Sequence, residues 1–283
     1  MTALRQQLID ELILRGYSPK TLEAYVGAVA GLAAYHKRPP DQLGDKEIRG
    51  YLLHLHTETT KAASTINVAV SGLRFFYVKV LRRPFYHLER GLPRVRREKR
   101  IPKAYSLDEI RQLLECGCTN FKHRLFLMTV YSAGLRLNEA CHLRFRDIDS
   151  SRMMIRVEQG KGRKDRYTLL SSRLLEQLRS YYRFCPSKCW IFPATRDPGQ
   201  PMSDGTGQHI FYHAVTRAGL PNKGGIHTLR HSFATHLVEA GMEIYILKGL
   251  LGHTSLSTTA GYLHVSRERI AEVKSPFDLI EQS

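Results

Sequence analysis

A basic, proline-containing segment at residues 90–103 divides this sequence into two parts that are expected to fold separately. The segment reads Arg-Gly-Leu-Pro-Arg-Val-Arg-Arg-Glu-Lys-Arg-Ile-Pro-Lys, with seven basic side chains and one acidic side chain. Its two prolines oppose a continuous helix, and its charge indicates a solvated linker. With 283 residues in the chain, each flanking part is long enough to bury its own core. We therefore expect an N-terminal domain at 1–90, a linker at 91–103 and a C-terminal domain at 104–283.

Four short helical patterns fill residues 1–90. The first spans about 3–15 and stops at Gly16, since glycine commonly follows the end of a helix. The second begins at Ser18-Pro19, because serine caps a helix and proline is tolerated in the first turn. The third carries apolar residues from Ile48 to Leu55, and the fourth begins near Ser64. Four helices with short connections predict a small bundle.

The C-terminal part shows mostly helical patterns and two candidate strands. It opens on Ser106-Leu-Asp-Glu109, which has the form of a capping box. Strand patterns at 152–158 and 165–170 are joined by a turn at Gly160-Lys161-Gly162. Helical patterns fit near 106–115, 121–132, 172–184, 204–219, 228–240, 243–251 and 264–273. The expected fold class is therefore mainly α, with a small antiparallel β-sheet in the C-terminal domain.

The charge balance predicts an anionic partner. Forty-three lysines and arginines stand against 26 acidic residues, which gives a net charge of +17. Residues 1–103 hold 19 basic and 9 acidic side chains, and residues 104–283 hold 24 and 17. Because both parts are net positive, we expect both to contact a nucleic acid, as a clamp would. A membrane partner is disfavoured, since the sequence has no basic amphipathic anchor and no run of 18 apolar residues.

The cysteine pattern fits a reducing cytosol better than a secreted disulfide framework, since five is an odd number. Cys116-Gly-Cys118 and Cys185-Pro-Ser-Lys-Cys189 lack the CxxC spacing of most four-thiolate metal sites, so packing or loop roles are expected. The N-terminal stretch carries Asp10 and Glu11 and has no small-residue cleavage site, unlike a signal peptide. These features favour a cytoplasmic protein.

Four short motifs carry candidate chemistry. They are Ala-Gly-Leu-Arg-Leu-Asn-Glu at 133–139, Gly-Lys-Gly-Arg-Lys-Asp-Arg at 160–166, His-Thr-Leu-Arg-His-Ser-Phe-Ala-Thr-His-Leu at 227–237, and Leu-Leu-Gly-His followed by a tyrosine at 250–262. Each motif alone has an ordinary explanation, such as a surface ion pair, a hairpin turn or a core tyrosine. Together, however, they contain the cations, proton carriers and nucleophile that phosphoryl transfer needs.

In this order and spacing the motifs resemble the tyrosine recombinase (phage integrase) family, especially its Xer-type and integron-integrase members. The resemblance covers nearly the whole chain and implies that the N-terminal bundle is a SAM-like core-binding domain. The stretch from Lys161 to His227 is too short for the extra helical insertion of integron integrases, which favours the Xer-like or transposon-associated branch. Alanine and glycine precede Tyr262, where bulkier residues are common in the family.

The resemblance implies a role for seven residues. Arg136 and Arg230 would clamp the phosphate, Tyr262 would be the nucleophile, His227 the general base, Lys161 the general acid, His253 a hydrogen-bond donor to the phosphate, and Glu139 a support for its neighbours. Arginine suits the clamps, because its planar guanidinium binds phosphate bidentately and stays protonated. Tyrosine needs such surroundings, because its phenol has an ordinary pKa of about 10.

Other residues in or near the motifs are expected to have alternative or structural roles. Lys164 is an alternative general acid, since it lies three residues after Lys161. Tyr245 lies in the apolar run Ile-Tyr-Ile-Leu and is expected in the core. His231 and His236 are expected to pack between helices or to support the catalytic groups.

The resemblance implies a site-specific DNA recombinase that works through a 3′-phosphotyrosine and a Holliday junction. No cofactor is expected, because the sequence has neither a DxD cluster for metals nor a Walker loop for ATP. The partners would be double-stranded DNA and three further copies in a homo-tetramer, with any second recombinase or accessory protein left open. The expected DNA-binding residues of the linker are Arg94, Arg96, Arg97, Lys99, Arg100 and Lys103.

Two other functions and one feature of the tail stay open. A monomeric type IB topoisomerase would use the same phosphoryl chemistry, and a non-catalytic DNA-binding regulator would use the same basic surface. Filled catalytic positions argue against the regulator, and the N-terminal bundle argues against the topoisomerase. In the tail, Phe277, Leu279 and Ile280 are apolar anchors that would dock on the same subunit or on a neighbour.

Overall fold

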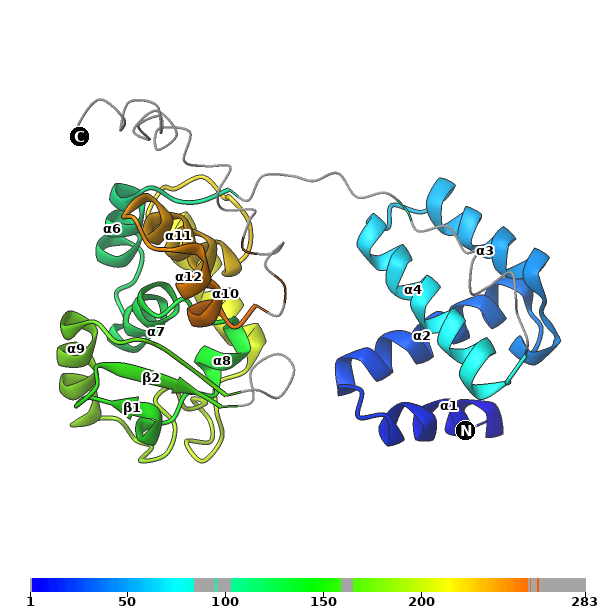
Figure 1. Ribbon diagram of the computed structural model, residues 1–283, viewed down its shortest axis with the longest axis horizontal. Helices are drawn as coiled ribbons and strands as arrows, with labels where there is room; N and C mark the ends of the chain where they lie inside the picture. The colour runs from blue at the N-terminus through cyan, green and yellow to red at the C-terminus, as the bar shows by residue number, and fades with distance from the viewer. Residues whose placement is uncertain are drawn as a thin grey trace, which may run out of the picture. The chain divides into compact units, whose positions relative to one another are not determined.

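The computed structural model describes residues 2–83, 95, 103–158, 165–253, 255 and 259. The chain divides into two compact units, Met1–Arg100 and Ile101–Ser283 (Figure 1). Each unit has its own hydrophobic core.

Over its described residues the N-terminal unit is a bundle of four α-helices: α1 (Ala3–Leu14), α2 (Pro19–His36), α3 (Asp45–Thr57) and α4 (Ala63–Phe75). A short 3₁₀ helix, η1 (Pro40–Gln42), follows α2, and a π-helical turn, η2 (Phe76–Val80), continues α4. The predicted boundary at Ser18 is confirmed, because its hydroxyl accepts a hydrogen bond from the backbone N–H of Thr21 at 3.3 Å. The predicted four-helix bundle is therefore confirmed.

The core of the N-terminal unit is built from one apolar face of each helix. The fully buried side chains include Leu8, Leu12, Leu32, Ile48, Leu73 and Tyr77. The Asn67 side chain of α4 pairs with both backbone polar groups of Val95, at 3.1 Å to its carbonyl oxygen and 3.0 Å from its N–H. This side chain thereby fixes one point of the expected linker against its own unit.

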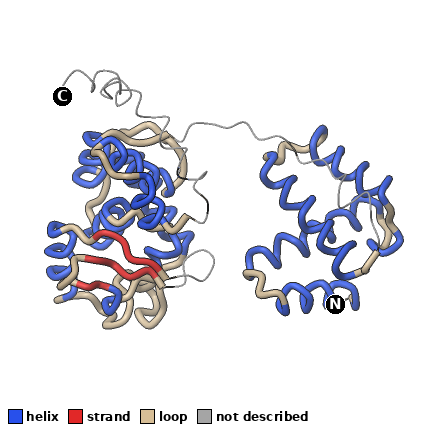
Figure 2. The backbone as a smooth tube through the Cα atoms, in the orientation of Figure 1, coloured by secondary structure: helices blue, strands red, loops and turns tan. Residues whose placement is uncertain are grey.

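The C-terminal unit is mostly helical with a small sheet (Figure 2). Its helices are α6 (Leu107–Cys116), α7 (Phe121–Ser132), α8 (Leu137–Cys141), α9 (Ser172–Tyr182), α10 (Asp204–Arg217), α11 (His227–Glu239) and α12 (Ile244–Leu251), with a 3₁₀ turn η3 (Phe145–Asp147). The antiparallel sheet has the strand order β1 (Ile148–Asp149), β2 (Met154–Val157) and β3 (Arg166–Leu169). The predicted fold class, mainly α with a small antiparallel sheet, is confirmed.

Several local features differ from the sequence prediction. The sheet has three strands rather than two, because the two-residue β1 is too short to show an alternating pattern. Helix α8 has five residues and likewise carries no detectable period. The prediction for Tyr245 is wrong: its side chain is 69% exposed, since α12 buries only the face that carries Leu247 and Leu251. The helix expected at 264–273 lies outside the described residues.

Helix α7 runs through the core of this unit and ends beside the candidate site. Leu125, Phe126, Leu127 and Val130 on this helix are all buried. Among the helices that the structure describes, none is long and apolar enough to cross a bilayer. All five cysteines are free thiols, and Cys141 is buried, which raises its pKa to about 12.

Candidate active site

Two turns at glycine residues bring Arg136 and His253, two of the predicted site residues, to the same region. Gly134 (φ +59°) follows α7, and Leu135 N–H returns to the carbonyl of Val130 at 3.1 Å. Gly252 (φ +60°) follows α12, and His253 N–H returns to the carbonyl of Lys248 at 3.2 Å. Both are the glycine turn that ends many helices, in which only glycine adopts the left-handed backbone without strain. Arg136 therefore lies just after the end of α7, and His253 lies just after the end of α12.

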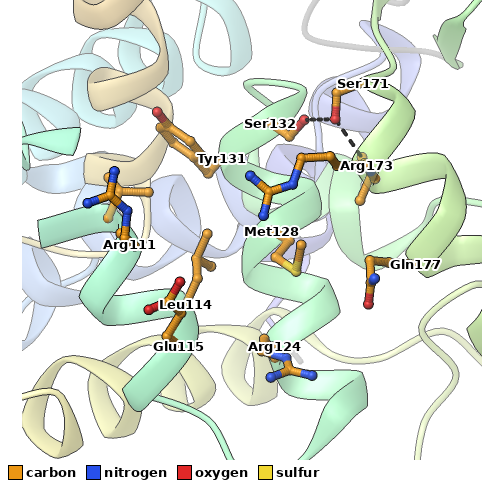
Figure 3. A pocket seen from close by; sticks show the side chains of 12 residues that line it. Arg111, Leu114, Glu115, Arg124, Met128, Tyr131, Ser132, Ser171, Arg173 and Gln177 are labelled. Carbon is orange, nitrogen blue, oxygen red and sulfur yellow. Dashed lines mark hydrogen bonds between the residues drawn. The ribbon is translucent and has the colours of Figure 1, made fainter. Parts of the chain in front are cut away.

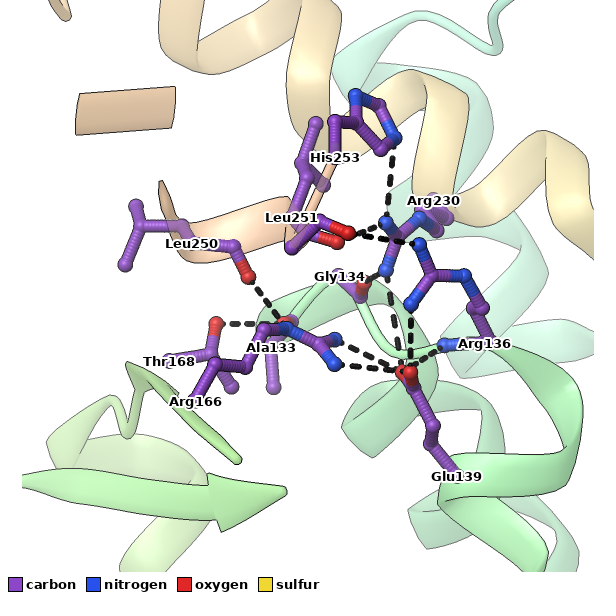
Figure 4. Close-up of polar contacts among 11 residues, drawn as sticks. Ala133, Gly134, Arg136, Glu139, Arg166, Thr168, Arg230, Leu250, Leu251 and His253 are labelled. Carbon is purple, nitrogen blue, oxygen red and sulfur yellow. Dashed lines mark hydrogen bonds and ion pairs between the residues drawn. The ribbon is translucent and has the colours of Figure 1, made fainter. Parts of the chain in front are cut away.

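Arg136 stands at the start of α8 and pairs with Glu139, one turn further along. Its Nη1 donates to Glu139 Oε1 at 2.7 Å, and its backbone N–H donates to Glu139 Oε2 at 2.8 Å. Its Nη2 donates to the carbonyl of Gly252 at 3.2 Å (Figure 4). A helix N-terminus favours a carboxylate at this third position, so α8 itself helps to hold Glu139.

Arg230 extends from α11 and is almost completely buried, with a relative exposure of 4%. Its Nη1 donates to the carbonyl of Gly134 at 2.6 Å, and its Nη2 donates to the carbonyl of Leu251. These carbonyls lie at helix C-termini, where the helix dipole makes oxygen atoms good partners for a cation. The side chain is therefore held by backbone that belongs to two other helix ends.

A third arginine, Arg166 at the start of β3, completes the cluster. Its two terminal nitrogens donate to the two carboxylate oxygens of Glu139, each at 2.8 Å, and its Nε donates to the carbonyl of Leu250 at 2.8 Å. Arg166 stands in the second motif, but its role was not predicted from the sequence. Nothing in the sequence separates it from the neighbouring basic residues, because its position depends on the pairing of Val157 with Arg166 across the sheet.

The cluster is an electropositive site around one buried carboxylate. Burial alone would raise the pKa of Glu139, but the hydrogen bonds and charge of Arg166, with the hydrogen bonds of Arg136, lower it to about 2. Glu139 is therefore ionised at neutral pH, and Arg230 Nη1 lies 3.9 Å from it. Three guanidinium groups against one carboxylate leave a net charge of two positive units. Such a site attracts an anion with several oxygen atoms.

The two predicted histidines border this cluster in their neutral forms. His253 lies with its Nε2 3.3 Å from Arg230 Nη2 and its Nδ1 3.0 Å from Thr259 Oγ1. Burial, followed by the charges of Arg230 and Arg136, lowers the pKa of His253 to about 4. His227 begins α11, and partial burial and the same two arginines lower its pKa too. A neutral imidazole can accept a proton, which a general base requires.

The family of the chain follows from comparison with known proteins. The model of the phage integrase family matches residues 103–269, and the model of the phage integrase N-terminal SAM-like domain matches residues 4–86. These ranges include the arginine cluster and the helical bundle. The chain belongs to the phage integrase family of tyrosine recombinases.

Individual members of the phage integrase family support the same assignment. A Sinorhizobium fredii protein whose name carries the words integrase/recombinase is 41% identical over 99% of this chain and 90% of its own length. A tyrosine recombinase of Pseudothermotoga lettingae is 32% identical over 94% of each chain. The crystal structure of a lambda integrase tetramer bound to a Holliday junction shares the fold, with a TM-score of 0.73, 21% identity, and coverage of 92% of this chain and 76% of that one.

The structure of this phage integrase family member brings five of the seven predicted site residues to one region. Arg136, Glu139, Arg230 and His253 are joined by the contacts above, and His227 lies close enough for Arg230 and Arg136 to act on its pKa. Lys161 and Tyr262 lie outside the described residues, as do Lys164 and the linker residues Arg94, Arg96, Arg97, Lys99 and Arg100. Lys103 is described and exposed.

Of the two other histidines on α11, His236 joins two helices. His236 Nδ1 lies 2.9 Å from the hydroxyl of Tyr131, which ties α11 to α7. His231 is half-buried, and burial, His227 and Arg230 lower its pKa.

A hollow in the C-terminal unit lies apart from the arginine cluster. It has a volume of about 480 Å³ between α6, α7 and α9, where Arg111, Arg124 and Arg173 surround Leu114 and Met128 (Figure 3). None of its lining residues belongs to the four motifs. Charge and hydrogen-bond donors converge at the arginine cluster and not in this hollow.

Proposed function

We propose that this chain is a site-specific recombinase that cuts one DNA strand with Tyr262, holds it as a 3′-phosphotyrosine and rejoins it to a partner duplex. The observation that carries the proposal is the cluster of Arg136, Arg166 and Arg230 around Glu139, with its net charge of two positive units. A phosphodiester is an anion that gains charge on its non-bridging oxygens during displacement. A fixed pair of guanidinium groups beside neutral histidines suits that change.

Each step of the proposed reaction has a residue to match. The Tyr262 oxygen forms a bond to phosphorus, the bond from phosphorus to the 5′-oxygen breaks, and the 5′-oxygen takes up a proton and leaves as the 5′-hydroxyl. His227 would accept the phenol proton, and Lys161 would supply the proton to the 5′-oxygen. Arg136 and Arg230 would hold the non-bridging oxygens. The reverse reaction with the 5′-hydroxyl of another duplex rejoins DNA without an external energy source, because the phosphotyrosine keeps the energy of the bond.

The supporting groups would keep these residues in place. Neutral His253 lies beside Arg230 and would donate a hydrogen bond to the phosphate. Glu139 would not contact DNA, since its side chain is only 7% exposed and its oxygens already bind arginine.

The proposed partner is double-stranded DNA, bound by both units. The N-terminal domain would bind one side of the core site, and the basic residues from Arg94 to Lys103 would lie along phosphates. Phosphate contacts of this kind set affinity and its salt dependence rather than sequence preference. The lambda integrase structure contains a tetramer on a Holliday junction. By analogy, we propose four copies of this chain on two DNA sites, acting in the cytoplasm through a four-way junction.

The test uses a duplex selected from a random-sequence library by repeated binding to the full chain. The selected duplex is nicked near its centre, so that cleavage releases a short piece and traps the covalent complex. We expect a complex that survives denaturant, retains a label placed at the 5′ end of the cleaved strand and yields a Tyr262 peptide with a nucleotide attached. Joining of two such sites on one plasmid would then demonstrate recombination. Covalent attachment at a 5′ end, or plasmid relaxation by single copies without a defined site, would contradict the proposal.

A further inference from the structure

Arg166 binds two separate parts of the site at once. Two of its donors occupy both oxygens of Glu139 on α8, and a third reaches the Leu250 carbonyl near the end of α12. A guanidinium is planar, so filling three acceptors in this way fixes the position of each relative to the others. Glu139 in turn pairs with Arg136, and the end of α12 receives Arg230 at Leu251.

The backbone at the end of α12 is shaped around this side chain. A Cβ atom placed on Gly252 would lie 2.7 Å from Arg166 Cδ and 3.2 Å from its Nε. Glycine at 252 therefore serves two purposes: it adopts the left-handed turn, and it leaves space for the Arg166 stem. This close approach is independent of the hydrogen bonds and shows that the Arg166 stem packs directly against the turn.

Burial distinguishes Arg166 from Arg156, the other arginine on the described strands of this hairpin. The Arg166 side chain is 8% exposed and that of Glu139 is 7% exposed, so water does not compete for their contacts. Arg156 on the neighbouring strand β2 is 43% exposed and pairs with Asp165 at 3.0 Å and Glu158 at 3.3 Å. An exposed pair of that kind contributes little and leaves its partners mobile.

We propose that Arg166 is a positioning residue for strand cleavage, which sets the two phosphate clamps Arg136 and Arg230 through Glu139 and the end of α12. It does not contact the DNA. The inference rests on the proposed function and adds a residue to it. Without the guanidinium of Arg166, Glu139 and the Leu250 carbonyl lose the side chain that hydrogen-bonds to both of them, and both clamps shift. Displacing a catalytic group by about 1 Å slows a reaction on the order of 100-fold.

The test compares three variants of the full chain: Arg166→Lys, Arg166→Gln and, as the matched control, Arg156→Gln on the facing strand. Lysine keeps a positive charge beside Glu139 and so preserves the fold. It cannot form the paired hydrogen bonds to both oxygens of Glu139 together with the third bond to the Leu250 carbonyl. Thermal melting and DNA affinity show whether each protein is folded. Single-turnover cleavage of the nicked, selected duplex then measures the chemical step.

A second substrate distinguishes a role of Arg166 in positioning the phosphate clamps from a role in protonating the leaving oxygen. In this duplex a sulfur atom replaces the bridging 5′-oxygen at the mapped scissile phosphate. A thiolate leaves without being protonated, because a thiol is far more acidic than an alcohol, whereas the phosphate still needs its clamps. If Arg166 sets the clamps, its loss slows the cleavage of both substrates by the same factor.

We expect Arg166→Lys to lower the cleavage rate on the order of 100-fold for both substrates, with DNA affinity within about threefold of the parent. Arg156→Gln should cleave like the parent. Unchanged cleavage by Arg166→Lys would overturn the inference, and so would recovery of the rate on the sulfur substrate, which would assign Arg166 to proton delivery. If the parent itself forms no covalent complex on the selected duplex, the proposed function fails first and independently.

Discussion

The guanidinium of Arg230 donates a 2.6 Å hydrogen bond to the carbonyl of Gly134, a residue 96 positions earlier in the chain. Gly134 precedes Arg136 by two residues, so this bond ties one proposed phosphate clamp to the turn that carries the other. A Cβ atom on Gly134 would lie 2.4 Å from the ring of Phe233, which is also on α11. The spacing of the two arginines is thus fixed by the packing of α11 against the end of α7.

Arg230→Lys tests the importance of that spacing. Lysine keeps the charge but cannot reach the carbonyls of Gly134 and Leu251 with one planar group. We expect strand cleavage to slow on the order of 10²- to 10³-fold, as for the loss of one preorganised donor, while DNA affinity changes little. Single-turnover cleavage and equilibrium binding measure the two quantities. Arg179→Lys, an exchange at an exposed site on α9, is the control, and an equal loss there would refute the explanation.

Glu139→Gln tests the buried carboxylate through its pH dependence. The pKa of Glu139 is lowered from 4.5 to about 2, so its ionised form stabilises the folded state above pH 4.5. That contribution, about 3 kcal/mol from the difference in pKa, is lost as the pH falls from 4.5 towards 2. We expect Glu139→Gln to reduce the free energy of unfolding strongly at pH 7 and by much less at pH 3.

Urea unfolding of the C-terminal unit at both pH values is the measurement for Glu139→Gln. Glu176→Gln, at an exposed site on α9, should change the free energy by no more than about 0.5 kcal/mol. A destabilisation by Glu139→Gln that does not depend on pH would argue against an ionised, arginine-paired carboxylate.

Gly252→Ala should disturb both the turn and the Arg166 stem. The left-handed backbone alone makes alanine unfavourable by about 1–2 kcal/mol, and its Cβ would also press on Arg166 Cδ. Gly249→Ala is a close control three residues earlier, because Gly249 lies inside α12 and a methyl group there would meet no atom within 4 Å. We expect it to be neutral or to stabilise by up to about 1 kcal/mol. Similar melting temperatures and cleavage rates for the two variants would contradict the account of Gly252.

His253 should stay neutral well below the pH at which ordinary histidines titrate. Burial and the charge of Arg230 lower its pKa from 6.5 to about 4. The unfolded chain then binds a proton that the folded chain rejects, so this residue reduces stability as the pH falls from 6.5 towards 4. A nuclear magnetic resonance titration of labelled histidines, assigned with His253→Asn, should give a midpoint near 4. A midpoint at or above 6.5 would show that His253 is a cation beside Arg230.

The sequence predicted the parts of this protein that depend on local signals. Ser18 and Ser106 mark helix starts because each caps its own helix within three residues. The roles of Arg136 and Arg230 rested on family resemblance, since spacing alone does not show that their side chains meet. Arg166 was missed because its role depends on strand register and on a contact with Glu139, 27 residues away. Tyr245 was misplaced because an apolar run does not reveal which face of a short helix is buried.

The central claim is that Tyr262 attacks the DNA, and a comparison of two tyrosines tests it most directly. Tyr262→Phe and Tyr245→Phe each remove one phenol oxygen, and Tyr245 is exposed on α12, only 17 positions away. Both proteins and the parent are incubated with the nicked, selected duplex, and the denaturant-resistant protein–DNA complex is measured. The account predicts no complex with Tyr262→Phe and a normal amount with Tyr245→Phe. Covalent attachment by the Tyr262→Phe protein would contradict it.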